Sequence, residues 1–153
     1  MAIIIKKEVN RHWGLSVTSG VTVVAGMVGR FDTTDTTGAT ATTAVAASAN
    51  AIGLFLESNV AKGTGLGLNS RSDTNGSDKV SVATNGGWFL IYDDGRGCPY
   101  DNSQTYTLGQ PLWTNAYGRV TNVATASGIT NQIGICTKVP TTATDSLGVK
   151  LLV

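Results

Sequence analysis

The segment "NAIGLFL" at residues 50–56 returns as "NQIGICT" at residues 131–137. Each copy contains an Ile-Gly pair at the start of an apolar run. Glycine is costly inside a β-strand, so we expect Gly53 and Gly134 to lie where another backbone passes close or the strand bends sharply. The repetition therefore predicts the same local backbone arrangement at two places in the chain.

The likeness between the two copies extends upstream of the Ile-Gly pair. Each copy has an early glycine (Gly26 and Gly109), then an apolar segment, a turn that ends at glycine, and a run rich in small and β-branched residues. A β-meander has one apolar face, and two such faces packed together bury each other. The pattern predicts a compact β-barrel or sandwich built from a duplicated β-meander, over approximately residues 24–58 and 107–139.

The composition also favours an all-β protein. The 153 residues fit one domain, and the 19 glycines and many threonines weaken helices. Alternating or apolar runs between Gly-rich turns predict strands in the second half of the chain, at 80–84, 88–92, about 111–113, 119–124, 132–138 and the final "LGVKLLV". In the first half, the alternation in "VTSGVTVVAGMVGRFDTTDTTG" from Val17, broken by Gly20, Gly26 and Gly29, and the Thr/Ala run that follows are also interpreted as strand, while residues 59–79 predict an exposed loop.

The N-terminal residues 1–17 predict an extended arm, and residues 18–153 a single β domain. The arm contains the β-prone run Ile3–Ile5 and no turn signal before Gly14. Two alternatives remain open. The segment is either an edge strand of the protein's own sheet or an arm that reaches a neighbouring subunit.

The charge pattern excludes several classes of partner. A net charge of +1 and a charged fraction of 14% provide no basic footprint for nucleic acid. The first apolar run precedes the basic pair, the reverse of a secretory signal, and no apolar stretch approaches about 18 residues. We therefore expect neither nucleic acid nor a membrane as a partner.

Catalytic chemistry has little support in the sequence. The single histidine, His12, lies in the predicted arm, away from Cys98, Cys136 and the serines that could act as nucleophiles. The two cysteines lack paired metal spacing, and we expect buried free thiols rather than a disulfide. The sequence thus predicts a protein that is not an enzyme.

Cofactor and metal sites are not expected either. The close carboxylate pairs Asp32/Asp35, Asp73/Asp78 and Asp93/Asp94 match turns without a full calcium-ligand set. The chain contains no phosphate-binding loop motif. We therefore expect no catalytic residue, no metal and no cofactor.

The aromatic residues between 88 and 117 are the remaining candidates for a site. Alternate residues of a strand share a face, so Trp88 and Tyr92 point opposite to Phe89, and one set must be core. The outward set either anchors an interface, as Trp, Tyr and Arg often do, or stacks on sugar rings. The candidate interface residues, including those of the arm, are Ile3, Ile4, Ile5, His12, Trp13, Trp88, Tyr92, Arg96 and Trp113.

The order Ala25-Gly26-Met27-Val28, Gly38, Ile52-Gly53 and Val80-Ser81-Val82 resembles the small capsid decoration (cement) proteins of tailed bacteriophages. The later "LGQPLWTNAYGRVT", "QIGICTKV" and "LGVKLLV" reproduce this order more closely. The resemblance covers about residues 17 to 153. The insertion at 59–79 and the segment "DDGRGCPYDNSQ" depart from the family pattern.

This resemblance implies a β-tulip-like or barrel-like fold and a structural role in the virion. Such proteins bind the major capsid protein on the outer capsid surface, often as homotrimers, after assembly in the host cytoplasm. They brace the shell against internal pressure. A carbohydrate-binding module or fibre head of a phage particle is the alternative function.

Overall fold

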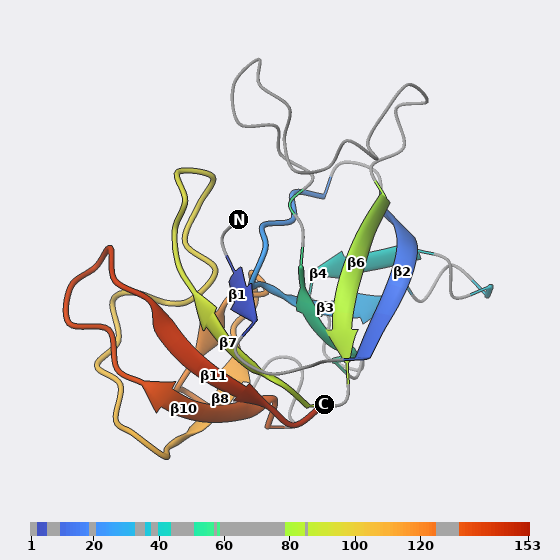
Figure 1. Ribbon diagram of the computed structural model, residues 1–153. Helices are drawn as coiled ribbons and strands as arrows, with labels where there is room; N and C mark the ends of the chain where they lie inside the picture. The colour runs from blue at the N-terminus through green and yellow to red at the C-terminus, as the bar shows by residue number, and fades with distance from the viewer. Residues whose placement is uncertain are drawn as a thin grey trace.

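The computed structural model describes residues 3–5, 10–18, 21–32, 36–37, 40–43, 51–56, 58, 79–84, 86–124 and 132–153. Within these ranges every regular element is a β-strand. The strands form a closed five-stranded barrel beside a six-stranded sheet (Figure 1). The all-β class and the barrel or sandwich architecture expected from the sequence are confirmed. Among the described residues, no helix is long and apolar enough to cross a membrane.

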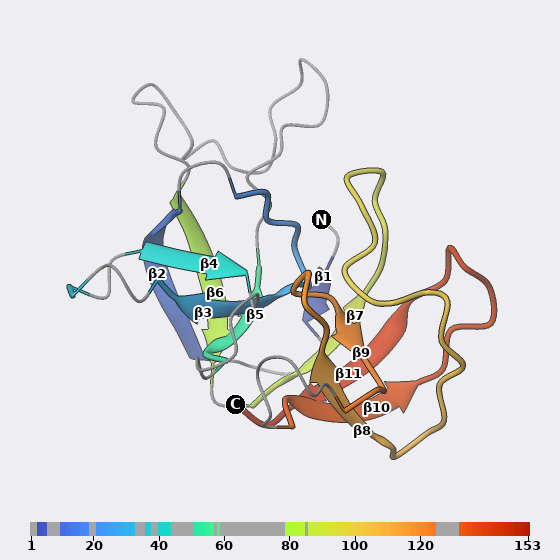
Figure 2. The ribbon, with the colours of Figure 1, turned by 180° about the vertical axis from the view of Figure 1, so that it is seen from behind.

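The closed barrel is built from strands between residues 10 and 84, in the order β2-β4-β3-β5-β6 (Figure 2). A parallel pairing of β2 with β4 and an antiparallel pairing of β2 with β6 close the ring. The strands are β2 (Asn10–Val17), β3 (Val28–Phe31), β4 (Thr40–Thr43), β5 (Gly53–Phe55) and β6 (Lys79–Thr84).

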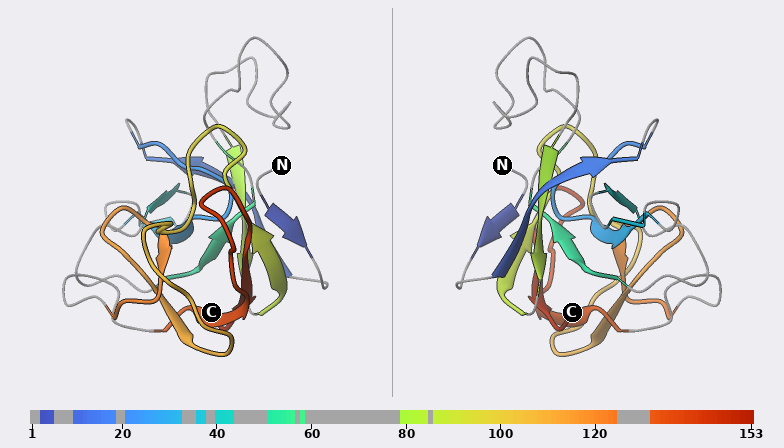
Figure 3. Two further views of the ribbon diagram at one scale, coloured as in Figure 1. Left: turned by 90° about the vertical axis from the view of Figure 1, so that its left-hand side faces the viewer. Right: turned by 90° about the vertical axis from the view of Figure 1, so that its right-hand side faces the viewer.

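The six-stranded sheet is antiparallel throughout, in the order β1-β7-β11-β10-β8-β9. It curls, as the side views in Figure 3 show. Apart from β1, its strands come from the C-terminal half of the chain. They are β1 (Ile3–Ile5), β7 (Trp88–Ile91), β8 (Pro111–Thr114), β9 (Val120–Thr121), β10 (Gly134–Lys138) and β11 (Leu147–Leu151).

One predicted strand is wrong in part. The alternating sequence from Val17, broken by Gly20, Gly26 and Gly29, is interpreted as strand, but residues 21–27 lie outside any strand and only Val28–Phe31 forms β3. Turn hydrogen bonds interrupt the segment, since the Met27 amide donates to the carbonyl of Val24 at 3.0 Å. Residues 23–27 are nevertheless all buried, so their apolar side chains pack in the core without a ladder. The predicted loop at 59–79 lies outside the described residues, apart from Lys79.

The two groups of strands share one register, and we call β2–β6 the first half and β7–β11 the second half. In the first half, Leu54 is the ladder partner of Val28 on one side and of Ala83 on the other. In the second half, Ile135 takes the same place between its two neighbouring strands. The corresponding residues are Val28 with Pro111, Leu54 with Ile135, and Ala83 with Lys150.

Hydrogen bonds outside the ladders repeat in the same way. The Gly26 amide donates to the Phe55 carbonyl at 2.7 Å, and the Gly109 amide donates to the Cys136 carbonyl at 2.8 Å. The amides of Ile52 and Ile133 likewise donate to Gly29 and Leu112, both at 2.8 Å. The halves are thus equivalent in backbone structure, and their origin by duplication stays a prediction.

The two glycines of the repeated Ile-Gly pair lie against equivalent backbone. A Cβ on Gly53, whose φ is 152°, would lie 1.6 Å from the Ala83 carbonyl oxygen. A Cβ on Gly134 would lie 2.6 Å from the carbonyl oxygen of Lys150, the residue that corresponds to Ala83. The close approach of another backbone therefore requires glycine at both places.

The halves differ where the second half begins. The strand β2 runs on to pair in parallel with β4 through Ser16 and Val17. Its counterpart β7 ends at Ile91, and the chain then makes an excursion over residues 92–98. The parallel contact returns only as an isolated bridge between Tyr100 and Val120. The second half is therefore a curled sheet with a gap, whereas the first half is a continuous barrel.

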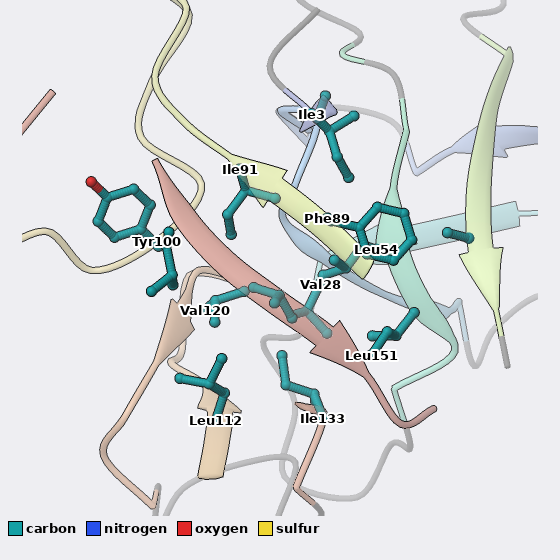
Figure 4. Close-up of a cluster of buried hydrophobic side chains, with 14 of the residues drawn as sticks. Ile3, Val28, Leu54, Phe89, Ile91, Tyr100, Leu112, Val120, Ile133 and Leu151 are labelled. Carbon is teal, nitrogen blue, oxygen red and sulfur yellow. The ribbon is translucent and has the colours of Figure 1, made fainter. Parts of the chain in front are cut away.

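The two halves bury two cores. One fills the barrel and includes Leu15, Met27, Phe55, Val80 and Val82. The other joins the halves, because outward side chains of the barrel pack against the inner face of the six-stranded sheet (Figure 4). Members of this joint core are Val28, Leu54 and Ala83 from the barrel and Phe89, Ile91, Leu112, Ile133, Val149 and Leu151 from the sheet.

The predicted arm is made of strands that pair within the chain. Ile3–Ile5 pairs with β7, and Asn10–Val17 belongs to the barrel. Ile3 is fully buried in the joint core. In the folded chain these residues thus form strands of the protein's own sheets, as in the first of the two alternatives. A contact of the arm with a neighbouring subunit stays a prediction.

Candidate functional site: an apolar outer sheet face

The six-stranded sheet carries apolar side chains on both faces. Inward residues such as Phe89 and Val149 fill the joint core. Their neighbours along each strand point the other way, because strand residues alternate between faces. We call this second surface the outer face; it is formed by Ile4, Trp88, Leu90, Pro111, Trp113, Ile135 and Lys150.

Four of these residues form a row of direct ladder partners across four strands. Trp88 pairs with Lys150, Lys150 with Ile135, and Ile135 with Pro111. Side chains that are opposite one another on neighbouring strands lie about 5 Å apart, so the row is continuous. Trp88 is 40% exposed and Pro111 is exposed, while Lys150 and Ile135 are half-buried.

The aromatic residue of this row has a defined partner. The ammonium of Lys150 lies 5.7 Å from the centroid of the Trp88 ring, within cation–π range. Trp88 remains 40% exposed beside this contact. Lys150 is the one charged residue among the seven named above, and Lys138 lies beside them because its ladder partner Gly148 is also the partner of Leu90.

The corresponding row of the first half is buried instead of exposed. Val28, Leu54 and Ala83 occupy the places of Pro111, Ile135 and Lys150, and all three are fully buried. The second half of the chain covers them. The same sheet position is thus covered in one half and open in the other.

The structure brings together only some of the predicted site residues. Ile4, Trp88 and Trp113 share the outer face, and Ile4 is 45% exposed. Ile3 lies in the core instead of at the surface. Tyr92 and Arg96 belong to the excursion after β7. The side chains of Ile5, His12 and Trp13 lie outside the described residues, although their backbones are strand.

Strand alternation had placed Leu90 on the face of Trp88, but sequence reasoning missed Pro111, Ile135 and Lys150. Aliphatic residues and a lone lysine have no chemical signature of a site, and only the sheet order places them beside Trp88 and Trp113. One sequence signal could have identified Ile135. The repeat aligns Ile135 with Leu54, and strand alternation places both side chains on the face that points away from the interior of their barrel or sheet.

The excursion at residues 92–98 is held by its own polar groups. The Asp93 carboxylate accepts hydrogen bonds from the amides of Gly95 and Gly97 at 2.8 and 3.1 Å. Asp94 accepts from the Arg96 amide and forms an ion pair with the Arg96 guanidinium. The pair Asp93/Asp94 therefore serves a turn, as its sequence predicts. Asp35, Asp73 and Asp78 lie outside the described residues.

The thiols and phenols near the joint core are poor nucleophiles. Cys98 and Cys136 are free, and burial raises the pKa of both thiols. Burial also raises the pKa of Tyr100 to about 12 and raises the pKa of Tyr106. All four groups are neutral at physiological pH, which suits packing and hydrogen bonding rather than nucleophilic attack.

The loop between β10 and β11 is fastened by one carboxylate. Asp145 accepts from the Lys138 ammonium at 2.7 Å and from the Thr141 amide at 3.0 Å. These bonds, that with Lys138 foremost, hold the pKa of Asp145 well below its usual range. The Tyr100 hydroxyl donates to the Asp145 carbonyl at 2.7 Å, tying this loop to the joint core.

Metal ligands do not converge in the part of the chain that the structure describes. No group of three or more His, Cys, Asp or Glu residues is close enough there to hold an ion. The seven outer-face residues named above offer apolar contact and the ammonium group of Lys150.

Comparisons with known proteins concern the fold. No protein-family model and no curated protein matches the sequence. Among solved structures, a chain of "The capsid of Myoviridae Phage XM1" is similar, with a TM-score of 0.64 and 14% sequence identity. The likeness covers 97% of this chain and 87% of that chain. The two chains therefore share a fold along almost their whole length.

Proposed function

We propose that this protein is a structural protein of a bacteriophage virion, a decoration protein that binds the outer surface of the head and stabilises it. The observation that carries the proposal is the fold shared with a phage capsid chain over 97% of this chain. The spacing of Gly26, Ile52-Gly53 and their repeats supports the same function through its resemblance to decoration proteins.

The surface chemistry agrees with a binding role that needs no catalysis. The outer face presents Trp88, Trp113 and Ile4 around one lysine, a composition typical of protein interfaces. The thiols and phenols described above are neutral and engaged in packing. We therefore propose a non-enzymatic protein without a cofactor or a metal.

The stabilising mechanism is mass action. A protein that binds the mature shell and not its dissociated or expanded form lowers the free energy of the mature shell by RT ln(1 + [L]/Kd) at each site. Many copies add their contributions, so modest affinity per copy suffices. The proposed partners are the major capsid protein and further copies of this chain, as a homotrimer, at the capsid surface.

The test compares phage particles that contain this protein with particles that lack it. We expect genome release on heating to occur at a lower temperature when the protein is absent, and to return to the original temperature when purified protein is added back. An unchanged release temperature would contradict the stabilising role. Light scattering coupled to size-exclusion chromatography tests the trimer.

A carbohydrate-binding or fibre-head function is the second candidate, favoured by two outward tryptophans, Trp88 and Trp113. Sugar sites combine aromatic stacking with polar groups that bind hydroxyls. Most of the outer-face residues named above are apolar; the hydrogen-bonding side chains on this face are Lys150, the tryptophan indoles, and Thr137 and Lys138 beside Gly148. We therefore prefer the decoration function, and binding of the isolated protein to a glycan array would reverse that preference.

A further inference from the structure

We propose that the outer face of the second half is the surface that docks on the shell, and that its partner is an apolar protein surface with a carboxylate opposite Lys150. The inference rests on the proposed function and specifies the site and the chemistry of its partner. The two halves are equivalent in backbone structure, so the surface that covers this position in the first half indicates what fits the open position in the second half.

In the first half of the chain, another part of the protein covers the sheet position that is equivalent to the outer face. Val28, Leu54 and Ala83 are fully buried because an apolar protein surface, the inner face of the second half, lies on them. Pro111 and Ile135 correspond to Val28 and Leu54, share their register and remain apolar. The chain thus shows that this sheet position accepts a protein surface, and in the second half the position is open.

The second step is the size and type of the exposed side chains. Trp88 and Ile4 are 40% and 45% exposed, and they flank Leu90 on neighbouring strand positions. Monomeric proteins seldom leave neighbouring large apolar side chains uncovered without an interaction to cover them. Tryptophan is also among the residues that contribute most to binding energy at interfaces. The surface therefore suits a partner that removes it from water.

The third step is the charge, which disfavours a two-fold contact between two copies through this face. Lys150 lies in the row between Trp88 and Ile135. A second lysine on this face, Lys138, whose ladder partner Gly148 is also the partner of Leu90, is ion-paired with Asp145 at 2.7 Å. Two copies packed by this face about a two-fold axis would bring two Lys150 ammonium groups toward each other in a desolvated interface. Like charges in such a place are costly. A partner with a carboxylate gains a charge-assisted contact instead.

The experiment adds purified protein to particles that lack it and measures bound copies after sedimentation. Lys150→Glu and Trp88→Ala are expected to weaken binding by about tenfold or more. The matched controls, Arg119→Glu and Tyr117→Ala, change an exposed charge and an exposed aromatic in the β8–β9 turn. We expect both controls to bind within about twofold of the original protein.

A further variant separates charge from apolar contact. Lys150→Met keeps an apolar row, so we expect binding that is weaker than that of the original protein but less sensitive to salt. Circular dichroism and thermal unfolding of every variant verify the fold before binding is measured.

The outcomes are distinguishable. If the original protein binds shells and the face variants bind equally well, the docking face is wrong while the decoration function stands. If the original protein does not bind shells at all, the proposed function fails. Glycan binding that Trp88→Ala abolishes, or a dimer that Trp88→Ala dissociates, would assign the face to a sugar or to a second copy and overturn the inference.

Discussion

The barrel of the first half and the curled sheet of the second half start from the same register of paired strands. The barrel closes because β2 continues from its partner β6 to a parallel pairing with β4. The sheet stays open because β7 stops at Ile91 and the excursion at 92–98 delays the parallel contact until Tyr100. A short interruption in one strand therefore changes a barrel into a sheet.

This difference decides where each half buries its apolar faces. Side chains of the barrel's own strands fill its interior, so a core of residues such as Phe55 and Val82 belongs to the first half alone. The open sheet has room on its inner face for the outward side chains of the barrel, including Val28 and Leu54. The halves are thus joined by an inside-to-outside contact, which leaves one outer face of the molecule without a cover.

The largest expected loss of stability comes from replacing the two equivalent glycines, Gly53 and Gly134. Gly53→Ala forces a Cβ into the Ala83 carbonyl and adds an unfavourable φ, so we expect a loss of more than about 4 kcal/mol in the free energy of unfolding. Gly134→Ala meets the Lys150 carbonyl at the longer distance of 2.6 Å and has the smaller effect of about 2 to 3 kcal/mol. Denaturant titration measures both.

Gly109→Ala provides the control for backbone strain alone. Its φ is 80°, but a Cβ there would meet no atom within 4 Å. We expect a loss of about 1 to 2 kcal/mol, the cost of the left-handed conformation. If Gly53→Ala cost no more than this, close backbone approach would not explain the repeated glycine.

The next effect compares a covered residue with its uncovered counterpart. Leu54→Ala removes a fully buried side chain from the joint core and should cost about 2 to 5 kcal/mol. Ile135→Ala, at the equivalent but half-buried place on the outer face, should cost less than about 1 kcal/mol. Equal losses in thermal or chemical unfolding would contradict the assignment of the outer face as open.

A smaller effect concerns the side-chain hydroxyl of Tyr100, the residue that forms the isolated bridge with Val120. Tyr100→Phe removes the hydroxyl that donates to the Asp145 carbonyl, and we expect a loss of about 1 kcal/mol at neutral pH. The raised pKa of Tyr100, about 12, adds a pH dependence. Its contribution is complete below the unfolded pKa of about 10 and is lost as the pH rises toward 12. The stability difference between the two proteins should therefore shrink on that alkaline side.

The smallest effect concerns the exposed loop between β10 and β11. Asp145→Asn removes the carboxylate that binds Lys138 and the Thr141 amide, and we expect a small fall in Tm at neutral pH. The pKa of Asp145 is lowered in the folded protein, so its contribution is present above the unfolded pKa of about 4 and is lost as the pH falls. A difference in Tm that persists unchanged in acid would contradict this role.

The residues themselves contained much of the fold. Strand alternation located β6 to β11, and the return of Ile-Gly indicated equivalent positions for Gly53 and Gly134. Both signals are local, since side-chain alternation and the steric demand of a missing Cβ act within a few residues. The same local signal misled at residues 21–27, where consecutive buried residues from Val23 to Met27 pack in the core outside any strand.

The candidate site was only partly contained in those local signals. Aromatic type singled out Trp88 and Trp113, but their companions Pro111, Ile135 and Lys150 join them through a sheet order that pairs strands far apart in the chain. Ile3 was grouped with Ile4, although the pleat sends one into the core and the other outward.

The sequence by itself determined that this is an all-β chain with two similar units, each with a glycine where a neighbouring backbone passes close. Only the tertiary structure decided that one unit closes, that the other stays open, and which equivalent face is covered. The physical reason is that local conformation follows from nearby residues, whereas burial depends on which distant surface arrives to exclude water.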